Sequence, residues 1–217
     1  MPDYVLRLLE DRLTPGARTP DLAPANRMLY CAEGSVSLAA ETLAANQARH
    51  TTTGARLQTG EEAAHVLRFE LVPAGGSDDG VLAADGVTSR PLLSRNITLE
   101  RGQDYLMRLD RVDFPLGAIA YLHTHQGPGI RCLVAGHIQV ETEGGTIERD
   151  PFEAWFEGGP EPVLARASEN VETAFVRAMV LPRALLGKSS ISYVRAEDRD
   201  KPKRQRYTVF QDQPIIL

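Results

Sequence analysis

The feature that most constrains the fold is a succession of short apolar runs that begins at Arg27. Runs such as MLYCAEGSVSL, YLMRLDRVDF and NVETAFVRAMVLP have the length and alternation of β-strands, and turn residues separate them. The 14 prolines and 18 glycines of this 217-residue chain fit many short elements joined by turns. No segment with helical periodicity lies between the runs. The pattern predicts an all-β protein, an antiparallel sandwich or barrel.

The first residues have a different pattern. Asp3 is followed by YVLRLLEDRL, which predicts a short amphipathic helix with Asp3 as its N-cap and Pro15-Gly16 at its end. Residues 14–26 are rich in proline, alanine and threonine and are typical of a linker. The only substantial helix is therefore expected within the first 14 residues.

Composition excludes several classes of partner. A net charge of −5 argues against general nucleic-acid binding, which needs a basic surface. The acidic residues near the N-terminus do not suit a signal peptide, and no apolar run is long enough to span a bilayer. Cys31 and Cys132 each lie in an apolar run, which predicts buried free thiols in a reducing cytoplasm. We expect a cytoplasmic protein whose partner is a small molecule.

Two segments of the chain resemble each other. LYCAEGSVSL in the first half is similar to RCLVAGHIQV in the second, and in each a glycine permits a bulge between two strands. We therefore expect a duplicated chain: residues 1–26 as helix and linker, 27–90 as a first unit with its connection, 91–182 as a second unit, and 183–217 as a C-terminal extension. The apolar end of this extension, residues 215–217, predicts packing against the body of the protein or against a second subunit, and we expect a homodimer.

Histidines distinguish the two units. His123 and His125 stand two apart in the second unit, so that on a β-strand both imidazoles face the same space. Arg131 shares their parity and is expected to face inward too. The first unit has only the isolated His50 and His65, which are more often surface or core residues than ligands. We interpret the first unit as structural.

The spacing around the histidine pair resembles the first signature of the cupin superfamily: Gly117, His123, His125 and Gly136 all match it. The segment FEAWFEGGPEPVLARAS is similar to the second signature. The resemblance implies a double-stranded β-helix, or jelly-roll barrel, and a bicupin-like chain whose N-terminal unit is degenerate. It also implies a metal site of three histidines and a glutamate. That set is incomplete, because Gly129 stands at the glutamate position, and Val163 or, in a second register, Phe156 at the last histidine position.

Three interpretations of the site follow. In the first, His123 and His125 hold a divalent metal (Fe, Mn, Ni or Zn) weakly, and Glu157 completes a set suited to an oxygenase or dioxygenase. In the second, the histidines and Arg131 form a metal-free pocket for an anionic or carbonyl-bearing ligand. In the third, the histidines are remnants in a structural barrel. We expect a small-molecule enzyme of the cupin type acting through His123, His125, Arg131 and Glu157, with a non-catalytic binding protein as the alternative.

Overall fold

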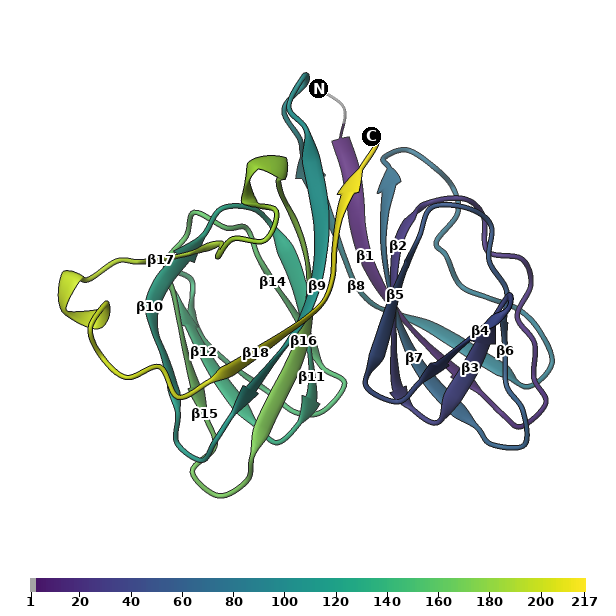
Figure 1. The fold of residues 1–217 in the computed structure, drawn as a ribbon, viewed down its shortest axis with the longest axis horizontal. Coiled ribbons are helices and arrows are strands. Elements are labelled where there is room, and N and C mark those ends of the chain that lie inside the picture. Colours follow the sequence, from purple (N-terminus) through teal and green to yellow (C-terminus); the bar gives the residue numbers. More distant parts are fainter. Residues whose placement is uncertain (1–2) are drawn as a thin grey trace. The chain divides into compact units, whose positions relative to one another are not determined.

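The computed structural model describes residues 3–217 and divides the chain after Gln103 into two compact units (Figure 1). The N-terminal unit also includes Ile216, and the C-terminal unit Leu217. Strands make up 58% of the chain and helix 3%, far below the helix share of about a third in average globular proteins. The all-β prediction is confirmed. The described helices are two 3₁₀ turns, η1 (Arg183–Leu185) and η2 (Ala196–Asp198), and in residues 3–217 no helix is long and apolar enough to cross a membrane.

The N-terminal unit consists of two antiparallel sheets. The larger has the strand order β5 (Gln47–Thr51), β2 (Asn26–Glu33), β7 (Ala64–Pro73), β1 (Asp3–Leu13), β8 (Val87–Thr98). The smaller has the order β4 (Glu41–Ala44), β3 (Ser35–Leu38), β6 (Leu57–Gln58). Leucines, valines and the free, buried Cys31 form an apolar core in this unit. Because β8 pairs with β1, the boundary between the units falls after Gln103 rather than after residue 90.

The predicted N-terminal helix is wrong, because Asp3–Leu13 forms strand β1. β1 pairs with β7 along one edge and with β8 along the other, so Arg7, Glu10 and Asp11 are buried as well as its leucines. Glu10 and Asp11 are 1% and 0% exposed, a burial that charged residues tolerate only when paired. The sequence places these charges on the polar face of a helix. Their partners come from strands far away in the chain, which no local pattern shows.

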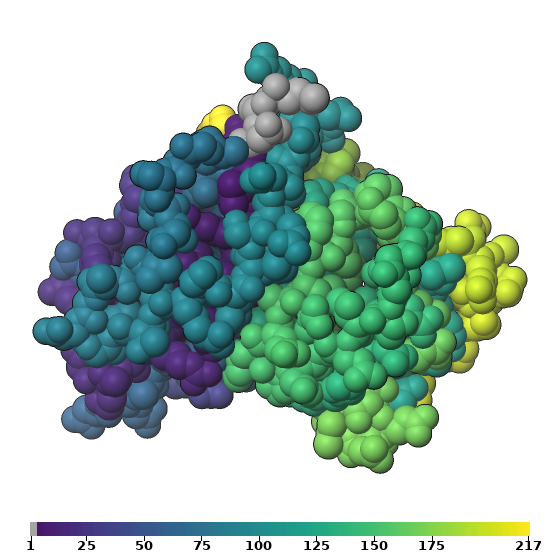
Figure 2. All heavy atoms as spheres, turned by 180° about the vertical axis from the view of Figure 1, so that it is seen from behind, coloured from purple at the N-terminus to yellow at the C-terminus, as the bar shows by residue number. Residues whose placement is uncertain are grey.

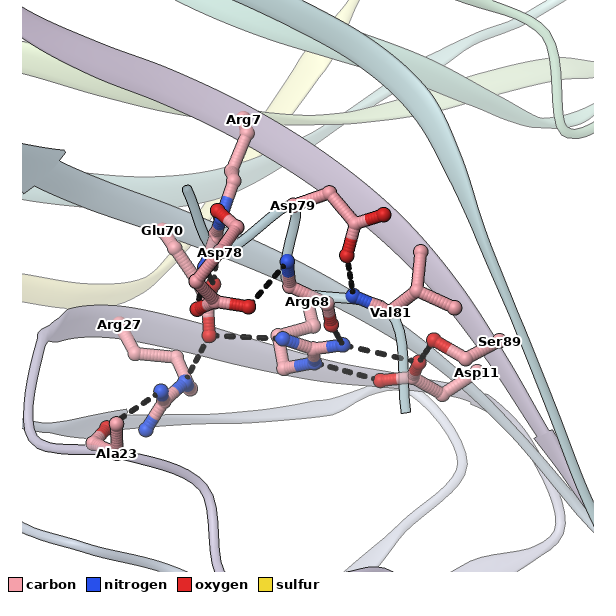
Figure 3. Close-up of polar contacts among 11 residues, drawn as sticks. Arg7, Asp11, Ala23, Arg27, Arg68, Glu70, Asp78, Asp79, Val81 and Ser89 are labelled. Atoms are coloured by element: carbon pink, nitrogen blue, oxygen red, sulfur yellow. Dashed lines mark hydrogen bonds and ion pairs between the residues drawn. The ribbon is translucent and has the colours of Figure 1, made fainter. Parts of the chain in front are cut away.

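Those partners form a buried network of ion pairs inside the N-terminal unit (Figure 3). Arg68 Nε lies 2.7 Å from Asp11 Oδ2, and Arg68 Nη1 lies 2.9 Å from Glu70 Oε1. Glu70 also accepts hydrogen bonds from Arg27 and from Arg7, the latter at 2.8 Å. Burial alone would raise the pKa of Glu70, but Arg68 and Arg27 outweigh it and lower that pKa to about 2. The network fills this end of the unit's interior with paired charges.

The C-terminal unit has two five-stranded antiparallel sheets. One has the order β14 (Ala154–Glu157), β11 (Gly129–Ala135), β16 (Thr173–Pro182), β9 (Tyr105–Phe114), β18 (Arg206–Ile215). The other has the order β13 (Gly145–Arg149), β12 (Ile138–Thr142), β15 (Val163–Ala167), β10 (Ile119–His125), β17 (Ile191–Tyr193). The residues expected as an extension belong to this unit, since β18 pairs with β9 and β17 with β10. The exposed turn around η2 lies on its surface, yellow in Figure 2.

The five-stranded sheet that contains β2 and the one that contains β11 have the same topology. When the strands of each sheet are ranked by their order along the chain, both sheets have the order third, second, fourth, first, fifth. In both units a bulge precedes the glycine that the sequence comparison aligns, Gly34 or Gly136. Both glycines have positive φ, +69° and +76°, and a Cβ at either would collide with a backbone carbonyl oxygen of the neighbouring strand. Only glycine fits such a position. The duplication stays a prediction, which this shared construction favours.

Candidate functional site

Strand β10 brings His123 and His125 together in the interior of the C-terminal unit. The side chains are buried, 6% and 4% exposed, and their Nε2 atoms lie 3.1 Å apart. The rings are perpendicular, with 4.8 Å between their centroids. Two imidazoles at i and i+2 share one face, as the alternation of a strand requires.

Hydrogen bonds define how each imidazole presents its nitrogens. His123 Nδ1 lies 2.7 Å from the carbonyl oxygen of Tyr121, so this ring donates through Nδ1 and carries its lone pair on Nε2. His125 Nε2 then donates toward His123, with Glu157 Oε2 3.3 Å away. Burial lowers the pKa of both rings, that of His125 to about 3. Both are neutral at pH 7.

Glu157 and Arg131 come from the neighbouring strands β14 and β11, where Gly129 faces Glu157 across the ladder. Arg131 Nη2 lies 2.7 Å from Glu157 Oε2, and Trp155 Nε1 donates to Glu157 Oε1 at 2.9 Å. Burial would raise the pKa of Glu157, but Arg131 and then His125 hold it well below its usual range. Burial lowers the pKa of Arg131 to about 10. The pair is therefore an ionised carboxylate beside a charged guanidinium.

These four side chains line an inner cavity of about 20 Å³, about enough for one water molecule. Arg177 and Tyr207 also line it, and the same two residues line an outer pocket of about 450 Å³. A pocket of that size accepts a small organic molecule. The outer pocket is bounded by residues 187–193 and by strands β9, β16 and β18.

The structure thus places all four residues singled out from the sequence, His123, His125, Arg131 and Glu157, around one cavity. Val163, one of the two positions considered for a missing histidine, lines that cavity and pairs with His123 in the sheet. The residues that sequence analysis missed are in the outer pocket: Arg108, Arg177, Lys188, Tyr193 and Tyr207. One signal was visible for Arg177, a lone charge inside the apolar run TAFVRAMVLP. Tyr207 gave none, because it stands in the segment read as an extension.

The donor set differs from the metal site that the cupin resemblance implies. Glu157 Oε2 is already paired with Arg131, and positions 129 and 163 offer no ligand side chain. In residues 3–217 no group of three or more His, Cys, Asp or Glu side chains is arranged to hold a metal ion. His125 Nε2 lies 3.1 Å from His123 Nε2 and 3.3 Å from Glu157 Oε2, but this does not change the conclusion, because the carboxylate is already paired with the guanidinium of Arg131. The residues do not fit a stable metal centre.

No family model and no curated protein sequence matches the chain. Solved structures do match it. AerE from Microcystis aeruginosa has a TM-score of 0.58 at 11% identity, over 82% of this chain and 88% of that one. A variant of oxalate decarboxylase from B. subtilis, with phenylalanine in place of one tryptophan, has a TM-score of 0.63 at 10% identity, over 87% and 71%. A second variant of the same enzyme, with tyrosine in place of that tryptophan, gives 0.64 at 10%, over 90% and 73%.

These neighbours are cupin proteins, so the chain has a cupin fold, as the two signature segments predicted. Oxalate decarboxylase from Bacillus subtilis has Mn(II) centres. At identities near 10% the likeness shows the fold alone, and function must be inferred from the site itself.

Proposed function

We propose that the chain is a small-molecule enzyme of the cupin type that acts on a small acidic or carbonyl-bearing compound. One observation carries the proposal: the outer pocket and the inner cavity share Arg177 and Tyr207 as walls. A ligand in the outer pocket would therefore contact the two residues that separate it from His123, His125 and Glu157. This geometry combines a binding space with titratable groups, which is the usual arrangement of an active site.

The charges of the outer pocket favour an anion. Arg108 and Arg177 are held by Asp212 and Asp110, with closest contacts of 2.9 and 2.7 Å. Lys188 is exposed and has no ion-pair partner in the described part of the chain, so it is the cation left for a ligand carboxylate. The tyrosine rings of Tyr193 and Tyr207 give the same pocket apolar walls and two hydroxyl groups.

The inner residues supply the chemistry. In the free protein both imidazoles are neutral and poor bases, because burial lowers their pKa values. A ligand carboxylate near them would raise those pKa values toward the range in which imidazole exchanges protons at neutral pH. His125 lies 3.3 Å from the carboxylate of Glu157, which would stabilise a proton gained by this ring. Arg131 would hold Glu157 ionised while this occurs.

Metal-dependent oxygenase chemistry, the first expectation from the sequence, is the second candidate. The observation that favours it is the approach of His123 Nε2, His125 Nε2 and Glu157 Oε2, with neighbouring contacts of 3.1 and 3.3 Å. It would require Arg131 to release Glu157. A non-catalytic binding protein would use the same pocket without turnover. An experiment can distinguish this function from that of an enzyme.

The test is a thermal-shift screen of small carboxylates and phenols on untagged protein. Ligands should raise the melting temperature of the parent, the Lys188→Ala variant should lose most of the shift, and Arg49→Gln, in the N-terminal unit, should retain it. A ligand that still shifts His123→Ala/His125→Ala equally would contradict the inner site. NMR of each stabilising compound incubated with protein then separates an enzyme, which consumes it, from a binder, which does not.

A further inference from the structure

We infer that Arg131 takes the place of a metal ion in this site: its guanidinium is the resident cation that neutralises Glu157 and keeps divalent ions out. The inference rests on the proposed function only in treating the inner cavity as the working site. It concerns which cation the cavity contains, and its test measures metal affinity rather than ligand binding.

Two contacts hold Arg131 in its buried position. Its side chain is 1% exposed, Nη1 donates to the carbonyl oxygen of Gly129 at 2.6 Å, and Nη2 lies 2.7 Å from Glu157 Oε2. A Cβ at Gly129 would lie 3.0 Å from Arg131 Nη1 and 2.7 Å from the carbonyl oxygen of Ala178. The backbone of Ala178 and the side chain of Met179, whose Cγ would also lie 2.7 Å away, therefore exclude a glutamate at position 129, and the guanidinium crowds the same space. The position at which the cupin pattern expects a carboxylate ligand is closed, and Arg131 is the charged group that contacts Glu157.

The charges around the cavity are already balanced. Arg131 and Arg177 are cationic, Glu157 and Asp110 are anionic, and the two histidines are neutral. A divalent ion would add two positive charges beside a guanidinium in a buried space, where such repulsion is strong. Removing Arg131 reverses the balance, because Glu157 would then be a buried carboxylate without a counter-charge, next to two imidazole nitrogens.

An ordinary structural ion pair would give a different result when broken. Loss of Arg131 would then only destabilise the unit, and metal affinity would stay as it was. If Arg131 replaces a metal, its removal destabilises the protein in metal-free buffer and creates a metal site at the same time. A measurement of metal affinity distinguishes an ordinary ion pair from an arginine that replaces a metal, whereas a measurement of stability alone does not.

The experiment compares Arg131→Met, which removes the charge at similar length, with Arg131→Lys, which keeps it. Untagged proteins are stripped with EDTA and titrated with Mn²⁺, Ni²⁺ and Zn²⁺ by calorimetry, and Co²⁺ absorption reports histidine ligation. Arg131→Met should bind one ion per chain at least about 100-fold more tightly than the parent. Arg131→Lys should resemble the parent, and His123→Ala added to Arg131→Met should abolish the gain. Equal affinities of Arg131→Met and the parent would overturn the inference.

A second variant keeps the test decisive if Arg131→Met does not fold. Val163→His adds an imidazole beside His123 and leaves Arg131 in place, so it should gain less than about 10-fold in affinity. Tight binding by Val163→His, or by the parent after dialysis against EDTA, would show that the guanidinium excludes nothing. A parent that binds small acids but also binds metal tightly would refute this inference and leave the proposed function standing.

Discussion

The buried network of the N-terminal unit gives a stability prediction with a defined pH dependence. Replacing Glu70 by glutamine keeps the shape of the side chain but removes the charge that joins Arg7, Arg27 and Arg68. Glu70 is 0% exposed, so the loss leaves three buried guanidinium groups with one buried carboxylate, that of Asp11. Removing one partner of a buried ion pair typically costs about 3–5 kcal/mol. We expect a loss of that size at pH 7.

The pH dependence follows from the pKa of Glu70, which is about 2 in the folded chain and has an ordinary value of 4.5. Since the folded pKa is the lower one, the unfolded chain binds the proton first as the pH falls. The stabilisation is present above pH 4.5 and disappears toward pH 2. A shift of about 1.5 pH units from the unfolded pKa to pH 3 corresponds to about 2 kcal/mol. The parent should lose that amount between pH 7 and pH 3 in excess of the loss shown by Glu70→Gln.

Urea unfolding of the parent and Glu70→Gln at both pH values measures this difference. Glu41→Gln is the matched control, because Glu41 forms an ion pair with Arg49 whose side chains are 58% and 44% exposed. Exposed pairs contribute about 0–1 kcal/mol. If Glu70→Gln costs no more than Glu41→Gln at pH 7, or loses as much stability as the parent on acidification, Glu70 does not hold the network together.

Three further predictions concern other parts of the chain. Gly136→Ala should destabilise the protein by more than about 2 kcal/mol, because a Cβ there meets the backbone at Glu172, whereas Gly16→Ala, with positive φ but open space, should cost about 1 kcal/mol in denaturant titrations. NMR titration of the parent should find the His125 ring uncharged down to pH 5, since burial lowers its pKa to about 3; a midpoint near 6.5 would contradict that burial. Light scattering should give a dimer mass, because Val209, Ile216 and Leu217 are 53%, 91% and 46% exposed, and a monomer at micromolar concentration would exclude it.

The sequence predicts the fold because its information is local. Alternation of period two, turn residues and a bulge glycine depend on neighbouring residues, and they indicate many of the strands of both units. β1 was predicted as a helix. Its charges mimic the polar face of a helix, and only pairing with β7 shows that Asp11 meets Arg68. Long-range ion pairs override local propensity there, and a single sequence does not reveal them.

The same distinction between local and long-range information applies to the candidate site. His123 and His125 follow from strand parity, and Glu157 was proposed from its place in the second signature. Their convergence depends on register, which sets Gly129 opposite Glu157 and allows Arg131 to reach the carboxylate. The outer pocket was not predictable, since it forms only when β17 and β18 pair with β10 and β9.

The two units use one motif in different ways. In each, an arginine of the middle strand of a five-stranded sheet, β7 or β16, pairs with an aspartate of the next strand at 2.7 Å: Arg68 with Asp11, and Arg177 with Asp110. Two positions after Arg68 stands Glu70, which attracts two more arginines and fills the interior with their ion pairs.

Two positions after Arg177 stands Met179, which is buried but brings no charge. Within residues 3–217 no further arginine forms an ion pair with Asp110, and Arg177 lines both the inner cavity and the outer pocket. The interior of the N-terminal unit contains a network of arginines, whereas the arginines that line the cavity with the histidines of the C-terminal unit are Arg131 and Arg177. The carboxylate present at Glu70 and absent at Met179 is therefore one difference between an interior filled by a network of ion pairs and one in which Arg177 lines a small inner cavity and the outer pocket.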